Sequence, residues 1–488
     1  MWRLARAPII AALGGFVPAD LESLEAASSV LTCATSREWG LSFDGEVDLG
    51  FAQWRTLLSF RDFRSDRSGD SDFNSLDIVQ LPFEDTRDRF FTAEMTLAGV
   101  VGRLDWLVGA FAFDQDTRQA SASVYGADLE AFLLRVFPAQ AGNIRGNFPA
   151  GRGAIDRRLT QRSKGVSLFT HNFLEVADGL RLIGGLRWLR EEKDGSGRFV
   201  SNGPICTRPG VPAGLRLLCQ TPDYNAEFSD SAVVGTAGIT YAPSPRAMVH
   251  FTWSRGYKAG GLNLDPSAGL GPAANLDFEP EEVENFELGA RYRSADRKAT
   301  LSLTLFQSDI SNFQQNAFDG QQPIISNAAE VRSRGVEFEA ALRPAEGIVL
   351  DTALTWNEAT YGEATTPATL IGQQIVNAPE WIWQAQATGE RPLSDRLVGF
   401  VSGNLRLQSD IRTAVNLAPE SEQDGYVLLG GRAGLRDPRR RWELSAFAQN
   451  LANQYFRQIV FASVLQPGSF NAFLGEPRTY GVELRWRF

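Results

Sequence analysis

The sequence has few of the residues that build disulfide-rich, metal-binding or helical membrane proteins. Its 488 residues include three cysteines and two histidines, and no run of eighteen apolar residues. Three cysteines are too few for a disulfide scaffold, and the missing apolar run excludes membrane-spanning helices. Membrane-spanning strands are not excluded, because such strands are apolar on one face only.

Negative charge exceeds positive charge, and almost all of the positive charge is arginine. The formal net charge is -10, the isoelectric point is near 5.1, and lysine occurs only at positions 164, 193, 258 and 298. A nucleic-acid surface needs clustered basic residues, so this class of function is disfavoured. The length would fit two or three soluble domains or one large barrel.

No catalytic, cofactor or metal motif stands out. His171 and His250 fall in separate predicted strands, and a metal site needs several converging ligands. Gly256, Gly260 and Gly261 lack the Gly-Lys-Ser/Thr ending of a phosphate loop. We therefore predict no enzyme activity, no metal site and no cofactor.

The C-terminal segment 477–488 alternates between two kinds of side chain. One face is apolar and the other bears glycine or charge; the apolar face consists of Tyr480, Val482, Leu484, Trp486 and Phe488. Such alternation is typical of a strand. It fits a soluble sheet with one wet face, and equally a membrane strand with lipid outside and a hydrated lumen inside.

Period-2 alternation between turn residues predicts seventeen strands. They lie at 40–47, 51–64, 88–99, 103–116, 160–176, 180–192, 227–242, 247–258, 282–293, 297–310, 331–343, 347–359, 380–391, 396–408, 425–436, 441–450 and 478–488.

The connections between these strands are alternately short and long. Short turns rich in Gly, Pro, Asp and Ser fall at 48–50, 100–102, 177–179, 243–245, 294–296, 344–346, 392–394 and 437–439. Long loops fall at 65–87, 117–159, 193–226, 259–281, 311–330, 360–379, 409–424 and 451–477. Outer-membrane barrels alternate short periplasmic turns with long extracellular loops, so we predict an all-β, antiparallel transmembrane barrel. A soluble β-rich module is the alternative.

The first 38 residues do not follow this pattern. Met1 to Arg6, the apolar stretch 7–17 and Val17-Pro-Ala19 outline a secretory signal. Bacterial barrels have even strand numbers, whereas seventeen is odd. Either residues 28–35 hide a further strand or an odd number of strands is missing before this start. We expect residues 1–38 to form an atypical segment and 39–488 to form the barrel.

Cys206 and Cys219 lie in one loop rich in Pro and Gly. In an oxidising compartment they could form a disulfide, although two cysteines in a loop could also remain unpaired. Cys33 has no evident partner.

Several segments, in order, resemble the barrel of TonB-dependent outer-membrane receptors. They are Leu104–Phe111, Trp253–Asn263, Glu284–Arg291, Arg334–Glu339, Asn377–Trp381, Gln449–Phe456 and Pro477–Phe488. The resemblance covers most of residues 39–488. It implies an outer-membrane protein of a Gram-negative bacterium, with 22 strands and an N-terminal plug that contacts TonB. It also implies that the alternating C-terminal residues serve the barrel-assembly machinery.

The same resemblance implies uptake of a scarce nutrient such as an iron–siderophore complex. No plug is recognisable before residue 39, so the resemblance favours a receptor that lacks its N-terminal part. TonB would act on it only if a plug is supplied. The alternatives are a plugless passive channel and a soluble surface binding module.

Ligand contacts are expected in the long loops and at one strand mouth. Arg255, Tyr257, Lys258 and Asn263 are placed there and could meet an anionic ligand. Acidic clusters at 66–72 and 279–284 could hold divalent cations that bridge lipopolysaccharide, or could simply be solvated. Outer-membrane lipid is thus an expected partner and nucleic acid is not.

Overall fold

A computed structural model describes most of the chain. The described residues are 7–18, 20, 23–152, 155–212, 215, 219, 223–263, 277–318, 323–365, 368–414, 418–463, 466 and 468–487. Phe488, residues 1–6 and Ala19 lie outside them, and so do the predicted roles of these residues. No helix among the described residues combines the length and the apolar character needed to cross a membrane.

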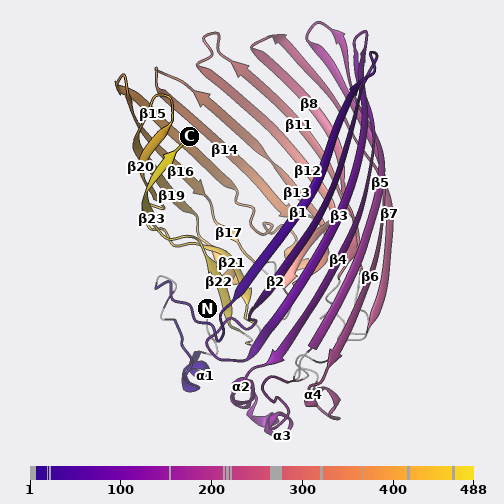
Figure 1. The fold of residues 1–488 in the computed structure, drawn as a ribbon, viewed down its shortest axis with the longest axis vertical. Coiled ribbons are helices and arrows are strands. Elements are labelled where there is room, and N and C mark those ends of the chain that lie inside the picture. The colour runs from indigo at the N-terminus through magenta and orange to yellow at the C-terminus, as the bar shows by residue number, and fades with distance from the viewer. Residues whose placement is uncertain are drawn as a thin grey trace.

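Long antiparallel strands dominate the structure (Figure 1). The strands are β1 Cys33–Asp48, β2 Gln53–Asp70, β3 Val79–Val101, β4 Leu104–Tyr125, β5 Ile155–Ala177, β6 Leu180–Ser201, β7 Tyr224–Ser244, β8 Ala247–Lys258, β9 Gly261–Leu262, β10 Asp277–Phe278, β11 Glu281–Arg293, β12 Ala299–Phe318, β13 Pro323–Leu342, β14 Ile348–Tyr361, β15 Trp381–Ser394, β16 Leu397–Gln408, β17 Ile411–Arg412, β18 Glu422–Gln423, β19 Tyr426–Arg436, β20 Trp442–Gln449, β21 Arg457–Ala462, β22 Phe470–Leu474 and β23 Thr479–Trp486. The helices are α1 Ala7–Ala12, α2 Leu129–Val136, α3 Ala141–Ile144 and α4 Pro204–Thr207, with single-turn 3₁₀ segments at Pro138–Gln140, Ala368–Leu370 and Pro419–Ser421.

Seventeen strands form one curved sheet in which each strand pairs with its neighbour in the chain. The order is β1 to β8, then β11 to β16, then β19, β20 and β23, and every pairing is antiparallel. This confirms the predicted all-β antiparallel fold. β1 and β23 are the two edges, and no pairing between them occurs within the described residues.

The strands are longer than predicted on the side of the long loops. β3 begins at Val79 rather than at residue 88, and β4 runs to Tyr125 rather than to 116. The predicted loop 311–330 was wrong for the most part, because β12 and β13 extend through it to Phe318 and Pro323. The sequence pattern breaks there because the residues that follow Leu305 on the outward face, Gln307, Asp309 and Ser311, are polar while the backbone stays extended.

The outward face of the sheet is apolar and exposed along a common belt. Outward side chains with a large exposed fraction include Leu41 (73%), Leu186 (57%), Leu288 (53%) and Tyr480 (81%). Charge begins at one level on adjacent strands, at Asp62, Arg89, Asp114, Lys164 and Arg190, which register places at or near the same height. A belt of this kind matches the hydrocarbon of a membrane, because lipid replaces the missing protein contacts.

Buried apolar clusters lie at the loop end instead. The largest contains Ile10 of α1, Leu76, Ile78 and Val79, and Leu129, Phe132 and Leu133 of α2. In Figure 1 the helices α1 to α4 gather at this end. The loops are therefore packed on one another, and two smaller clusters lie between the loop-side ends of strands, around Val331 and Tyr361 and around Ile155 and Phe199.

The loops that flank the two ends of the sheet also meet. The Gln466 side-chain amide donates to the carbonyl oxygen of Asp72 at 3.4 Å, and the ring of Phe73 lies 5.1 Å from that of Phe461. The first and last long loops are thus in contact although nearly four hundred residues separate them.

The proposal of an additional strand at residues 28–35 was wrong within the described residues. Cys33, Ala34 and Thr35 are the first residues of β1, which pairs with β2 from Cys33↔Ser68 onward. The first strand of the sheet therefore starts seven residues before the predicted start at 40, and the strand count remains odd.

Candidate functional site

A polar wall crosses the inward face of six neighbouring strands, β11 to β16. Cross-strand register aligns Arg291, Ser302, Glu339, Ala353, Gln384 and Arg406 in one row. A second row, one step closer to the short turns, contains Thr300, Ala341, Asp351, Gln386 and Asn404. Residues directly opposite on paired strands share a face, so these side chains form one continuous surface.

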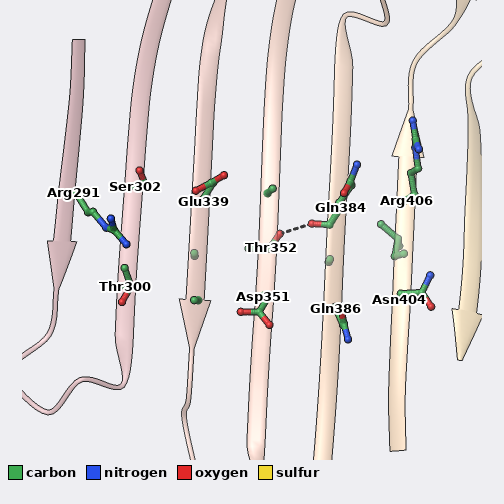
Figure 2. A pocket seen from close by; sticks show the side chains of 15 residues that line it. Arg291, Thr300, Ser302, Glu339, Asp351, Thr352, Gln384, Gln386, Asn404 and Arg406 are labelled. Carbon is green, nitrogen blue, oxygen red and sulfur yellow. Dashed lines mark hydrogen bonds between the residues drawn. The ribbon is translucent and has the colours of Figure 1, made fainter. Parts of the chain in front are cut away.

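The wall lines an open cavity of about 670 Å³ (Figure 2). Two cationic groups, Arg291 and Arg406, stand at its sides, and the carboxylates Glu339 and Asp351 lie between them. Within the described part of the chain, none of these four charged groups takes part in an ion pair; Arg406 donates to Gln408. Charges without partners in a hydrated cavity remain available to a passing solute.

The opposite face of the same strands has the side chains expected of a lipid-facing surface. Thr352 donates its hydroxyl to the carbonyl oxygen of Gln384 at 3.1 Å and accepts from the Trp383 indole at 2.8 Å. The Thr352 hydroxyl and the Trp383 indole N–H are therefore satisfied locally, as hydrocarbon requires. Phe338, Leu354 and Trp383 are exposed beside them.

The predicted strand-mouth residues lie away from this cavity and bind carboxylates. Arg255 is paired with Glu282 at 2.6 Å, and the Lys258 ammonium lies 4.0 Å from Glu281. Both acidic partners belong to β11, the neighbouring strand. The prediction that these cations face an anionic ligand is not tested by these contacts, which show that the mouth is already partly neutralised.

Tyr257 and Asn263 hold the same region together. The Tyr257 hydroxyl donates to Asp230 at 2.7 Å, and its burial together with the Asp230 carboxylate raises the pKa of the phenol. The Asn263 amide donates to the carbonyl oxygen of Ile325 and accepts from its N–H, both at 3.0 Å. Asn263 thereby connects the end of β9 to β13.

The two loop cysteines form a disulfide. Cys206 and Cys219 are bonded, with their Cα atoms 5.2 Å apart, and both pack against the large loop cluster. This resolves the alternative that the sequence left open. Cys33 is a free, exposed thiol at the start of β1.

The acidic clusters do not form a metal site in the described part of the chain, where no three potential ligands converge. Asp72 accepts from the backbone N–H groups of Val79 (2.7 Å) and Ile78 (3.2 Å), and Asp70 accepts from those of Asp72 and Phe73. These carboxylates hold the first long loop in shape. The apolar row of β23, from Tyr480 to Trp486, is exposed on the outward face as predicted.

A membrane-embedded antiparallel sheet with an apolar exterior, a polar interior and packed loops at one end defines an outer-membrane barrel for transport. The family model for the TonB dependent receptor-like β-barrel matches residues 26–451. The chain therefore belongs to the TonB-dependent receptor β-barrel family, which consists of outer-membrane transport proteins of Gram-negative bacteria and not of enzymes.

The chain is similar to several characterised receptors over part of their length. It is 33% identical to the pesticin receptor of Yersinia pestis over 119 residues, which is 24% of this chain and 17% of the receptor. It is 24% identical over 331 residues to the catecholate siderophore receptor Fiu of Escherichia coli O157:H7, covering 66% of this chain and 41% of Fiu. The soluble-module alternative is not compatible with this membership.

Solved structures show the same fold. The ferric yersiniabactin uptake receptor FyuA of Yersinia pestis superposes with a TM-score of 0.73 at 17% identity, over 94% of this chain and 61% of FyuA. The siderophore receptor PiuA of Acinetobacter baumannii gives 0.67 at 16% identity, over 92% of this chain and 64% of PiuA. The chain thus spans less than two thirds of these relatives.

The wall of Figure 2 was not predicted from the sequence. Alternation indicated which of its side chains share a face within one strand. Only the register between strands shows that Arg291 and Arg406, far apart in the chain, border one cavity.

Proposed function

We propose that this chain forms the solute-conducting barrel of a receptor for uptake of a scarce nutrient, such as an iron–siderophore complex. Fiu is described as a catecholate siderophore receptor and FyuA as a ferric yersiniabactin uptake receptor. Both are distant relatives, so they support the class of solute and not its identity.

The observation that carries the proposal is the polar wall on β11 to β16. It presents two guanidinium groups and two carboxylates without ion-pair partners among the described residues, in a cavity of about 670 Å³. A ferric siderophore is a large polar complex, often anionic, and arginine binds carboxylate and catecholate oxygens with several N–H donors. Energised uptake would additionally need a plug that contacts TonB.

Within this proposal, Lys258 is the contact at the strand mouth. Its side chain is 60% exposed and lies at the outer limit of an ion pair with Glu281. Arg255 remains 43% exposed while bound to Glu282 and could exchange that partner for an anionic ligand. Tyr257 and Asn263 would position this strand end through Asp230 and Ile325.

The test measures how tightly an anionic ferric tris-catecholate complex binds to the detergent-solubilised chain. Quenching of tryptophan fluorescence reports the binding. The double variant Arg291→Gln, Arg406→Gln should bind about tenfold more weakly, which corresponds to about 1.4 kcal/mol. The matched control is the double variant Arg332→Gln, Arg334→Gln, which also removes two positive charges, both from β13, where these arginines are paired with Asp309 and Glu358.

Equal affinities for the wall variant and the control would contradict a role for the wall. Absence of saturable binding, combined with steady ion conductance in planar bilayers, would favour the passive channel instead.

A further inference from the structure

Four arginines lie side by side on the outward face of the first four strands. They are Arg37 of β1, Arg64 of β2, Arg87 of β3 and Arg118 of β4, and each is paired in register with the next. Directly opposed residues on antiparallel strands have Cβ atoms only about 5 Å apart. Like charges in such positions destabilise a sheet, so this arginine row needs a compensating anion.

The protein compensates only part of this charge. Asp62 is 4% exposed and is shared by Arg87 (2.5 Å), Arg89 (3.2 Å) and Arg64 (3.4 Å). Asp116 is paired with Arg118 at 2.7 Å. For Arg37 no ion pair exists within the described residues. Five guanidinium groups, with Arg89 included, therefore share two carboxylates at this level.

The next level toward the loops is acidic. Asp66 lies opposite Asp85, one step beyond the arginine row on the same face. Neither carboxylate is in an ion pair with the row in the described structure. The arginine row thus separates an acidic level from the apolar belt, and its guanidinium groups keep free N–H donors.

The height of the row identifies what faces it. Toward the short turns, the next level on this face holds Asp62, with Trp39 opposite it on the edge strand. The level after that holds Phe60 and Phe91, which are opposite each other. Phe91 is 43% exposed and Trp39 is 60% exposed. Aromatic rings below and arginines above mark the boundary between hydrocarbon and headgroups on the side of the long loops.

We propose that the arginine row binds the phosphate groups of phosphorylated lipids in the outer leaflet, with the acyl chains lying along Phe60, Phe91 and Trp39. Guanidinium groups recognise phosphate oxygens through paired N–H donors, and the row offers several such groups at one level. A soluble protein or nucleic acid could not reach this face, because the apolar belt below it is covered by lipid. The inference concerns the lipid-facing surface and is independent of the solute taken up.

The test compares two double variants that each remove two positive charges, one from β1 and β2 and the other from β2 alone. Arg37→Gln with Arg64→Gln weakens the row and leaves Arg87 on the buried Asp62. Arg55→Gln with Arg61→Gln is the matched control, because these arginines are paired with Asp44 and Glu38 on the inward face. Each chain is placed in phosphatidylcholine vesicles with or without bisphosphorylated lipid A, and its thermal unfolding midpoint is measured.

Lipid A should raise the midpoint of the native chain and of the control. In the row variant this rise should fall at least about fivefold, while its midpoint in pure phosphatidylcholine should equal or exceed the native value because repulsion is relieved. A purely structural role for these arginines would lower the midpoint in both lipids. The same rise in all three chains would overturn the proposal.

Two further measurements identify the ligand. Lipid A without its phosphates should give no rise, and inorganic phosphate alone should not reproduce the effect of the lipid. If inorganic phosphate stabilised the chain as strongly, the row would be a site for soluble anions and the lipid assignment would be wrong. None of these measurements depends on siderophore binding, so the proposed uptake function can fail separately.

Discussion

The ring of Phe306 on β12 lies over Gly335 on β13, its direct partner in the register of the two strands. A Cβ atom at position 335 would be 2.7 Å from Cζ of this ring and would also collide with the carbonyl oxygen of Trp356. The same arrangement recurs where Phe113 covers Gly165 and Phe447 covers Gly481. An aromatic ring above a cross-strand glycine fills the missing side-chain volume and fixes the register.

Gly335→Ala should therefore destabilise the barrel, by about 1–3 kcal/mol, because neither the ring nor the backbone carbonyl can move freely. The matched control is Gly184→Ala on β6, where nothing lies within 4 Å of the added Cβ atom. Urea unfolding in lipid vesicles, followed by tryptophan fluorescence, measures both. Equal midpoints for the two variants would show that the glycine at 335 is not required by packing.

The first long loop should respond to pH through Asp72. Burial raises the pKa of this carboxyl to about 8, and the nearby Asp70 charge adds to the shift, against hydrogen bonds from Val79 and Asn74. The folded loop then binds a proton that the unfolded chain releases near its ordinary pKa of 3.8. The stability of this loop is therefore greatest below the unfolded pKa of 3.8. It falls by at most about 1.4 kcal/mol per pH unit as the pH rises from there, and it levels off above the folded pKa of about 8.

Hydrogen exchange of residues 71–79 between pH 5 and pH 9, corrected for the intrinsic rate, measures this loss. Asp72→Asn cannot ionise, so its protection should be nearly independent of pH. A variant that loses protection as steeply as the native chain would show that another group titrates. Asp72 contacts only the loop junction, and the strands of the sheet should not respond.

Removing the disulfide should loosen the loop end alone. The bridge between Cys206 and Cys219 closes a loop with a sequence separation of 13, and closure of this size stabilises by about 2–4 kcal/mol. Cys219→Ser should increase proteolysis within 202–223, because the bridge anchors this segment to the α2 cluster. Cys33→Ser is the control and should change nothing. Unchanged proteolysis of Cys219→Ser would mean that the apolar contacts are sufficient.

The sequence predicts the sheet far better than the site. Alternation and turn chemistry locate strands such as β11 and β14 because one face of each meets lipid and the other meets water. The strand extensions at Val79 and Tyr125 escape prediction, since outside the membrane both faces carry polar residues. Lys258 is found at its strand mouth from local pattern, whereas its partner Glu281 comes from the next strand of the sheet.

Rows of residues that run across several strands cannot be predicted from one sequence segment at a time. Arg37, Arg64, Arg87 and Arg118 each look like an isolated surface residue in the sequence. They become neighbours only when four strands adopt one register, which cross-strand packing and turn geometry determine together. An alternation pattern fixes the face of each residue and leaves its height along the strand undetermined.

A charge pair near the short turns that follow β15 and β19 tests how much burial of an ion pair matters for stability. Arg436 is 8% exposed and donates to Glu390 at 2.5 Å. Glu390→Gln should cost about 2 kcal/mol, because it leaves a largely buried guanidinium without a counter-charge. Glu358→Gln is the control: its partner Arg334 is 54% exposed, so its loss should cost less than about 1 kcal/mol.

The double variant Glu390→Gln, Arg436→Met distinguishes the stability that the ion pair contributes from the cost of burying an unpaired charge. Since the uncompensated cation is then removed, it should be more stable than Glu390→Gln alone in the same urea titration. If the double variant is instead less stable by the sum of the two single losses, Arg436 is held by other contacts. The ion pair would then contribute little to the stability of the sheet at its short-turn end.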